Sequence, residues 1–224
     1  VFAMADKVIV LSEEWEQFFA KNVCDERKIV VFHNGVILPE YHKDDYSDHN
    51  VLFLGRLGER KGTYDLLKVI PNVLTKIPDA MFFFGGDGDV EQCKELAAKT
   101  GISKHVSLLG WISGAEKEEY FKKCSAFVLP SYHEGMPMSV LESMAYGLAT
   151  ISTNAGGIPQ IIKQGINGYR VEAGDLQGLE KILIQVVEDS ERKKLLGKAA
   201  RKRIEESFNV EKSIDRLYEL YQNI

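Results

Sequence analysis

Cysteine is scarce in this chain of 224 residues, which holds three, Cys24, Cys93 and Cys124. They lie far apart in the sequence, and none forms a C-x-x-C or Cys–His pair at metal-ligand spacing. This pattern excludes a disulfide-stabilised secreted scaffold and a structural zinc site. We therefore expect reduced thiols and a cytoplasmic protein.

Long apolar runs and an excess of basic residues are also absent. No run approaches the roughly 20 apolar residues that a membrane-spanning helix needs, and no signal peptide is visible. The formal net charge is −5, which disfavours a nucleic-acid partner. The chain has no GKS or GKT phosphate loop, and no G-x-G-x-x-G opens its first unit, so a dinucleotide-dependent oxidoreductase is disfavoured.

What the sequence does contain is a series of short apolar segments that alternate with helix-length periodic ones. Strands are expected at 51–54, 81–84, 106–109, 127–129, 149–152 and 169–171, with helices near 63–77, 90–100, 115–124, 139–146 and 159–163. This alternation predicts an α/β fold, a doubly wound parallel sheet that is Rossmann-like, with a ligand outside the carboxyl ends of the strands.

Two flanks stand apart from this predicted domain, which we place at 51–206. Residues 1–38 contain one more strand–helix–strand unit that begins in the middle of a fold, so we expect a fragment of a longer protein. Residues 39–50 are polar and predict a linker. Residues 207–224 extend a helical flank, and Val210 to Asn223 carry an apolar stripe that either packs on the parent domain or crosses to a domain outside this chain. The stripe consists of Ile214, Leu217, Tyr218 and Tyr221.

The segment from Pro130 to Glu142 is the most informative one. It places Glu134 in a loop after an apolar strand and Glu142 inside the following helix. The N-terminus of that helix attracts anions because its first N–H groups lack partners. Carboxylates beside an anion site are poor phosphate ligands but good acceptors for hydroxyl groups. This combination predicts a site for a nucleotide sugar.

Other expected strand ends carry further candidates. Arg56 and Lys61 follow the first strand of the main domain and are suited to phosphate, although a solvated basic loop is an equal alternative. Asp87 and Asp89 have the spacing of a metal-binding pair, but Asp89 is as easily a helix N-cap, and two nearby cations make a metal unnecessary.

Two segments leave alternatives open. The backbone at Trp111 and Ile112 is suited to pairing with a nucleobase edge, whereas Trp111 as packing and Ser113 as an N-cap are equally good readings. The basic run on the predicted C-terminal helices is either a solvated face or a contact with an anionic membrane surface. Its members are Arg192, Lys193, Lys194, Lys198, Arg201, Lys202 and Arg203.

Together these motifs resemble the C-terminal, donor-binding half of retaining glycosyltransferases with the two-domain GT-B architecture, family 4 (glycosyl transferases group 1). The resemblance covers nearly the whole chain. It depends on Gly55-Arg56-Leu57 with Lys61-Gly62, on Gly86-x-Gly88, on Pro130-Ser131-x-x-Glu134-Gly135 with Glu142, and on Gly147 and Gly156-Gly157. One departure is Gln160, where the family often has Glu.

The resemblance implies a role for each matching residue. Arg56 and Lys61 would hold the donor diphosphate and, with Glu134, act as the catalytic group. Glu134 would contact the transferred sugar, and Glu142 would accept hydrogen bonds from the ribose. The remaining donor-binding positions would contribute mainly backbone: Gly55, Gly86, Gly88, Trp111, Ile112, Gly135, Met136, Pro137, Ser139 and Val140.

The implied activity is transfer of a sugar from a UDP-, GDP- or ADP-sugar to a saccharide or lipid-linked acceptor, with no metal or other cofactor. Residues 1–38 would be the end of an acceptor-side N-terminal domain, and the last helix would pack back toward it. The longer protein would be cytoplasmic or peripheral at the inner face of the membrane. The alternatives are a nucleotide-sugar 2-epimerase of the same fold and a non-catalytic nucleotide-sugar-binding module, which would have no use for Glu134.

Overall fold

A parallel sheet of six strands forms the centre of the computed structural model, which describes residues 2–222. The strand order is β5-β4-β3-β6-β7-β8. The strands are β3 (Asn50–Leu54), β4 (Met81–Gly85), β5 (Val106–Gly110), β6 (Ala126–Leu129), β7 (Ala149–Thr153) and β8 (Tyr169–Val171). All five neighbouring pairs are parallel, which confirms the predicted α/β class.

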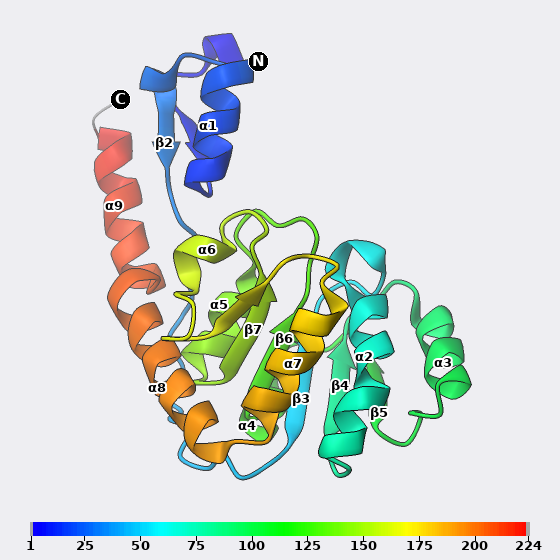
Figure 1. Ribbon diagram of the computed structural model, residues 1–224. Helices are drawn as coiled ribbons and strands as arrows, with labels where there is room; N and C mark the ends of the chain where they lie inside the picture. The colour runs from blue at the N-terminus through cyan, green and yellow to red at the C-terminus, as the bar shows by residue number, and fades with distance from the viewer. Residues whose placement is uncertain (1, 223–224) are drawn as a thin grey trace.

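Helices cover both faces of the sheet, as a doubly wound fold requires. α2 packs against α3 and α7 on one face, and α5 packs against α8 on the other (Figure 1). The helices of this part are α2 (Thr63–Lys76), α3 (Val90–Lys99), α4 (Gly114–Lys123), α5 (Met138–Ala145), α6 (Ile158–Ile161), α7 (Leu176–Val187) and α8 (Ser190–Ser207). Over the described part of the chain, no helix combines the length and apolarity needed to cross a bilayer.

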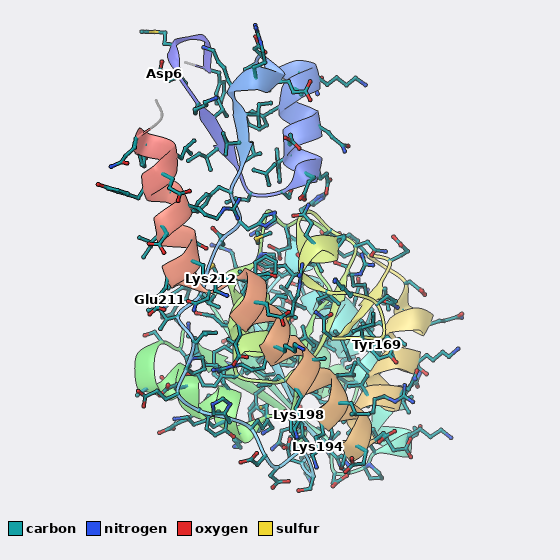
Figure 2. The ribbon with its side chains drawn as sticks, turned by 90° about the vertical axis from the view of Figure 1, so that its left-hand side faces the viewer. Asp6, Tyr169, Lys194, Lys198, Glu211 and Lys212 are labelled. Atoms are coloured by element: carbon teal, nitrogen blue, oxygen red, sulfur yellow. The ribbon has the colours of Figure 1, made fainter. Side chains whose placement is uncertain are left out.

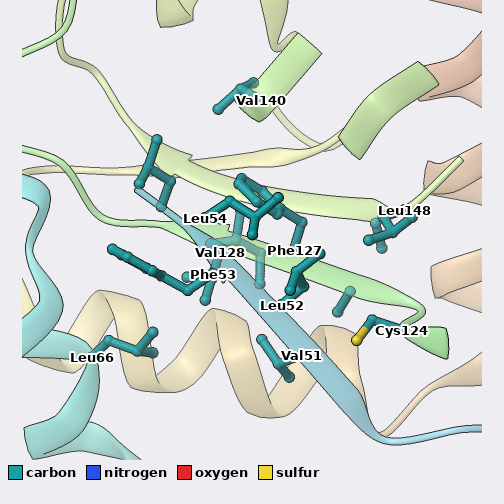
Figure 3. Close-up of a cluster of buried hydrophobic side chains, with 14 of the residues drawn as sticks. Val51, Leu52, Phe53, Leu54, Leu66, Cys124, Phe127, Val128, Val140 and Leu148 are labelled. Atoms are coloured by element: carbon teal, nitrogen blue, oxygen red, sulfur yellow. The ribbon is translucent and has the colours of Figure 1, made fainter. Parts of the chain in front are cut away.

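The core is built from strands that are apolar on both faces. Leu52 of β3 and Phe127 of β6 are fully buried at the centre of the sheet. Figure 3 shows Leu66, from α2, on one side of these strands and Val140, from α5, on the other. Uninterrupted apolar runs are therefore what a sheet between two helical layers demands.

The direction of the winding reverses between β3 and β6, which are neighbours at the centre of the sheet. The loops that follow these two strands consequently meet at the carboxyl edge. The carbonyl of Arg60 accepts a hydrogen bond from the Tyr132 N–H at 2.9 Å and another from the Ser131 hydroxyl at 3.1 Å. The topology thus brings the predicted phosphate loop against the loop that carries Glu134.

A second, smaller unit precedes the sheet. It consists of η1 (Phe2–Met4), β1 (Val8–Val10), α1 (Glu13–Asn22), η2 (Glu26–Lys28) and β2 (Ile29–Val31). β1 and β2 pair in parallel, which confirms the predicted strand–helix–strand unit, and Ser12 caps α1 by accepting from the Trp15 N–H. The boundaries of the predicted domains stay a prediction.

The apolar stripe of the last helix, α9 (Val210–Gln222), is not packed on the parent domain. Ile214, Tyr218 and Tyr221 are 58–66% exposed. Figure 1 shows α9 extending from the body toward the N-terminal unit. The alternative in which the stripe packs on the parent domain is therefore wrong for these three side chains. Asn223, at the end of the predicted stripe segment, lies outside the described residues.

The basic run of α8 does not form one solvated face. Lys194 and Lys198 lie on the outside of α8, on the face turned to the viewer in Figure 2, but Lys193 is fully buried and donates to the Asp48 carbonyl. Burial lowers the pKa of the Lys193 amine. Arg201 donates to the Ala145 carbonyl at 2.7 Å. The prediction of a solvated face was wrong for Lys193 and Arg201, because these two residues tie α8 to the rest of the domain.

Gly62 gives a direct test of how closely the two central loops pack. Its φ is +68°, and an added Cβ would lie 2.0 Å from the Pro130 carbonyl oxygen. Gly101 has a similar φ of +74° with no heavy atom within 4 Å. We expect Gly101→Ala to lower the free energy of unfolding by about 1 kcal/mol through backbone strain, and Gly62→Ala by at least a further ~2 kcal/mol. Urea unfolding of both variants measures this, and equal losses would show that the loops do not pack as described.

Candidate functional site

Four loops at the carboxyl edge of the sheet are joined directly to one another. The loops after β3 and β4 pair through the Leu57 N–H and the Asp87 carbonyl, at 2.6 Å. The loops after β6 and β7 are joined by the Thr153 hydroxyl, which donates to the Ser131 carbonyl at 2.6 Å. These bonds fix the relative positions of the predicted site residues before any ligand binds.

Gly86 and Gly88 belong to this loop packing. A Cβ at Gly86 would lie 1.9 Å from the Gly55 carbonyl oxygen, and one at Gly88 would lie 2.3 Å from that of Leu57. Both positions therefore need glycine for the contact between the two loops, whether or not a ligand is present. That Gly55, Gly86 and Gly88 also admit a ligand stays a prediction.

Lys61 and Glu134 form an ion pair across the two central loops. Lys61 Nζ lies 2.6 Å from Glu134 Oε1, and the side chains are only 15% and 6% exposed. The predicted phosphate cation and the predicted sugar acceptor are thus partners of each other in this structure. An anion that binds Lys61 competes with Glu134 for the ammonium, and a ligand with both phosphate and hydroxyl groups satisfies both side chains.

Arg56 supplies a second cation close by, which is free to bind an anion. Its side chain is exposed and makes no hydrogen bond or ion pair with any residue between 2 and 222. Its Cγ lies near Gly88, 3.0 Å from where a Cβ would stand. Arg56 therefore projects from the paired loops with its guanidinium unoccupied.

The loop after Glu134 enters α5 without a side-chain cap. Pro137 stands at the N-cap position, and the first turn, which holds Ser139 and Val140, contains no acidic residue. The carbonyl of Gly135 accepts from the Gly157 N–H at 2.6 Å, and that of Met136 accepts from the Asn34 side chain at 3.0 Å. The loop is held from two sides, and the N-terminus of α5 keeps its positive potential.

Glu142 is paired with a lysine that the sequence analysis did not select. Lys117 Nζ of α4 lies 2.8 Å from Glu142 Oε1, and the two side chains are about one third exposed, at 31% and 27%. Both line a groove of about 570 Å³ between α4, α5 and the 35–39 segment, which Met138 also lines. The groove does not reach Lys61 or Glu134.

The two predicted site residues in the loop after β5, Trp111 and Ile112, differ in how exposed their side chains are. The Trp111 side chain is 76% exposed, so the alternative in which it packs in the core is wrong. Ile112 is 7% exposed and packs beneath Gly85. Ser113 holds the N-cap position of α4 without a side-chain cap bond. Trp111 is thus available to a ligand, whereas Ile112 offers only its backbone.

The Asp87–Asp89 segment shows no sign of a metal centre. Asp89 stands at the N-cap position of α3, but its carboxylate accepts from the Tyr64 hydroxyl at 2.7 Å instead of capping the helix. This hydrogen bond raises the pKa of Tyr64 to about 12. Within residues 2–222, no cluster of three or more His, Cys, Asp or Glu side chains is arranged to hold a metal ion.

Comparison with known proteins identifies the family. Residues 39–203 match the model of the family described as glycosyl transferases group 1. The chain belongs to this family. An uncharacterized glycosyltransferase of Methanocaldococcus jannaschii is 30% identical over 98% of the chain and 60% of its own length. The Escherichia coli UDP-Gal:alpha-D-GlcNAc-diphosphoundecaprenol alpha-1,3-galactosyltransferase is 28% identical over 96% of the chain and 59% of its own length.

Solved structures of other proteins show the same fold. Anabaena Alr3699/HepE, in complex with UDP and glucose, matches with a TM-score of 0.90 at 19% identity, over 100% of this chain and 65% of its own. Staphylococcus aureus TarM, in a complex that includes UDP, matches with a TM-score of 0.89 at 21% identity, over 98% and 44% of the two chains. This chain spans about 60% of the length of the curated relatives that it matches.

The loops of this group 1 chain therefore bring most predicted site residues to one edge of the sheet. Lys61 and Glu134 meet between the two central loops, Arg56 projects from the paired loops after β3 and β4, and Glu142 lies one turn into α5, in the groove. Sequence reasoning missed Lys117. It carries no sequence signal, because its partner Glu142 is 25 residues away.

The ion pair predicts a specific pattern of stability. Lys61→Met leaves a nearly buried carboxylate without its partner, so we expect a loss of about 2 kcal/mol in the free energy of unfolding. Adding Glu134→Gln removes the stranded charge and should recover at least half of that loss. Urea unfolding of the two single variants and the double variant completes the cycle. Strictly additive effects would mean that the two side chains do not interact.

Proposed function

We propose that this chain is the donor-binding part of a retaining glycosyltransferase that moves a sugar from a nucleoside-diphosphate sugar to a saccharide or lipid-linked acceptor. The observation that carries the proposal is the Lys61–Glu134 ion pair beside the uncapped N-terminus of α5. A phosphate group would bind the Lys61 ammonium, and a sugar hydroxyl would donate a hydrogen bond to the Glu134 carboxylate. A nucleotide sugar is a ligand that offers both groups a few bonds apart.

Uridine diphosphate is the first donor nucleotide to test. The Escherichia coli relative is named for a UDP-sugar, and the Anabaena and Staphylococcus aureus structures contain UDP. Carried to this chain, the proposal places the diphosphate between Arg56, Lys61 and the first N–H groups of α5. The ribose then lies at Glu142, and the uracil lies by the backbone of Trp111 and Ile112. GDP- and ADP-sugars are the other candidates.

The chemistry follows from where charge develops. As the glycosidic bond to the diphosphate breaks, negative charge grows on the leaving phosphate and positive charge grows on the sugar ring. Cations and helix N–H groups that are already in place stabilise the leaving group without reorganisation. In the retaining mechanism that we propose, Glu134 orients the sugar while the acceptor hydroxyl attacks from the leaving-group side and passes its proton to the departing phosphate. No metal is assigned a role, because Arg56 and Lys61 supply the charge.

The acceptor half of the reaction belongs to the longer protein. We propose that residues 1–38 are the end of an acceptor-side domain and that residues 207–224 pack back toward it. The segment that follows β2 contacts the donor loop, since the Asn34 side chain donates to the Met136 carbonyl. Sugar transfer itself, the cytoplasmic location and any contact with the inner face of the membrane are proposals for that longer protein.

The first test is binding of UDP by calorimetry. Arg56→Ala should weaken UDP binding about tenfold or more, because a charge-assisted hydrogen bond to phosphate is lost. Arg60→Ala, an exposed arginine in the same loop, is the matched control and should bind like the wild type. EDTA should leave the affinity unchanged. Equal binding by wild type and Arg56→Ala would remove the phosphate assignment.

The second test uses Glu134→Gln in the longer enzyme. Turnover should fall at least about 100-fold, since the group that orients the sugar loses its charge. Affinity for UDP should stay the same or rise by up to about tenfold, because Lys61 is no longer held in an ion pair with the charged Glu134 carboxylate. Steady-state kinetics and calorimetry on the same preparation separate the two effects. Unaltered turnover would show that Glu134 has only a structural role.

A further inference from the structure

Lys117 occupies a position that no part of the proposed mechanism has used. It lies one turn into α4, lines the groove and donates to Glu142 Oε1 at 2.8 Å. The helices that carry the pair are packed together, because Phe121 of α4 stacks on Tyr146 at the end of α5 with ring centres 4.7 Å apart. The geometry of the pair is therefore set by the fold.

The pair leaves both partners with unused hydrogen-bonding groups. Throughout the described residues, no side chain or backbone group donates to Glu142 Oε2, and the Lys117 ammonium forms no hydrogen bond besides that to Glu142. A carboxylate has two acceptor oxygens, and an ammonium has three donors. The neighbouring carboxylate, Glu118, does not compete, since its Oε1 accepts from the Tyr146 hydroxyl at 2.6 Å.

A vicinal diol matches this arrangement. Each ribose hydroxyl both donates and accepts, so one can donate to Glu142 Oε2 while its oxygen, or that of its neighbour, accepts from Lys117 Nζ. A glutamate without the lysine would lose freedom on binding, whereas the ion pair holds its carboxylate in place beforehand. We propose that Lys117 is a positioning residue that, with Glu142, makes the site selective for ribose over deoxyribose. This inference rests on the proposed function.

The experiment compares UDP with 2′-deoxy-UDP by calorimetry. The wild type should prefer UDP roughly tenfold or more, because hydrogen bonds to charged groups are lost with the 2′-hydroxyl. In Lys117→Met the preference should shrink to about threefold or less, with Lys117→Gln as a second variant should the first fail to fold. Lys117→Arg, which keeps the charge and the donors, should restore most of the preference.

Two controls separate selectivity from general damage. Lys122→Met changes a lysine of the same helix that pairs with Glu118 at 3.5 Å and does not line the groove, and it should keep the wild-type preference. Lys61→Met should weaken both nucleotides equally. A preference that survives in Lys117→Met, or equal weakening of both nucleotides in that variant, overturns the inference.

The outcome for the wild type distinguishes this inference from the proposed function. Binding of UDP and 2′-deoxy-UDP with equal affinity overturns the role of the Lys117–Glu142 pair but leaves a nucleotide site. No binding of either nucleotide overturns the proposed function itself.

Discussion

The ion pair between Lys61 and Glu134 is the interaction on which the rest of this account depends. It joins the loops after β3 and β6, at the point where the winding of the sheet reverses, and it is nearly buried. A charged pair in such a position costs desolvation free energy, so its value to the fold is modest. In the proposed function it contributes more, because Lys61 binds a phosphate group and Glu134 accepts a hydrogen bond from a sugar hydroxyl.

The surrounding structure keeps this pair in place by close contact between loops. Gly62 touches Pro130, Gly86 touches Gly55, and a Cβ at Gly156 would lie 1.9 Å from the Glu134 carbonyl oxygen. Polar side chains add fixed hydrogen bonds, such as that from Thr153 to Ser131. A preorganised site of this kind loses little freedom when a ligand binds, which is a general requirement for electrostatic stabilisation of a developing charge.

Much of the fold could be predicted from the sequence, and less of the site. The strands were found because both faces of the sheet are covered, so segments such as Val51–Leu54 are uniformly apolar. The strand-end loops were found through glycines and charges. What escaped prediction depends on three-dimensional packing: the burial of Lys193 and the Lys117–Glu142 pair. No pattern along the chain marks residues that meet only across helices or loops.

The measurement that tests the central claim most directly is a crystal structure of this chain with UDP bound. The account predicts that Lys61 Nζ leaves Glu134 and lies within about 3 Å of a phosphate oxygen, with the diphosphate at the N-terminus of α5. Arg56 should contact the same diphosphate. A structure in which UDP is bound while Lys61 and Glu134 remain paired, with the diphosphate at another edge of the sheet, would contradict the account.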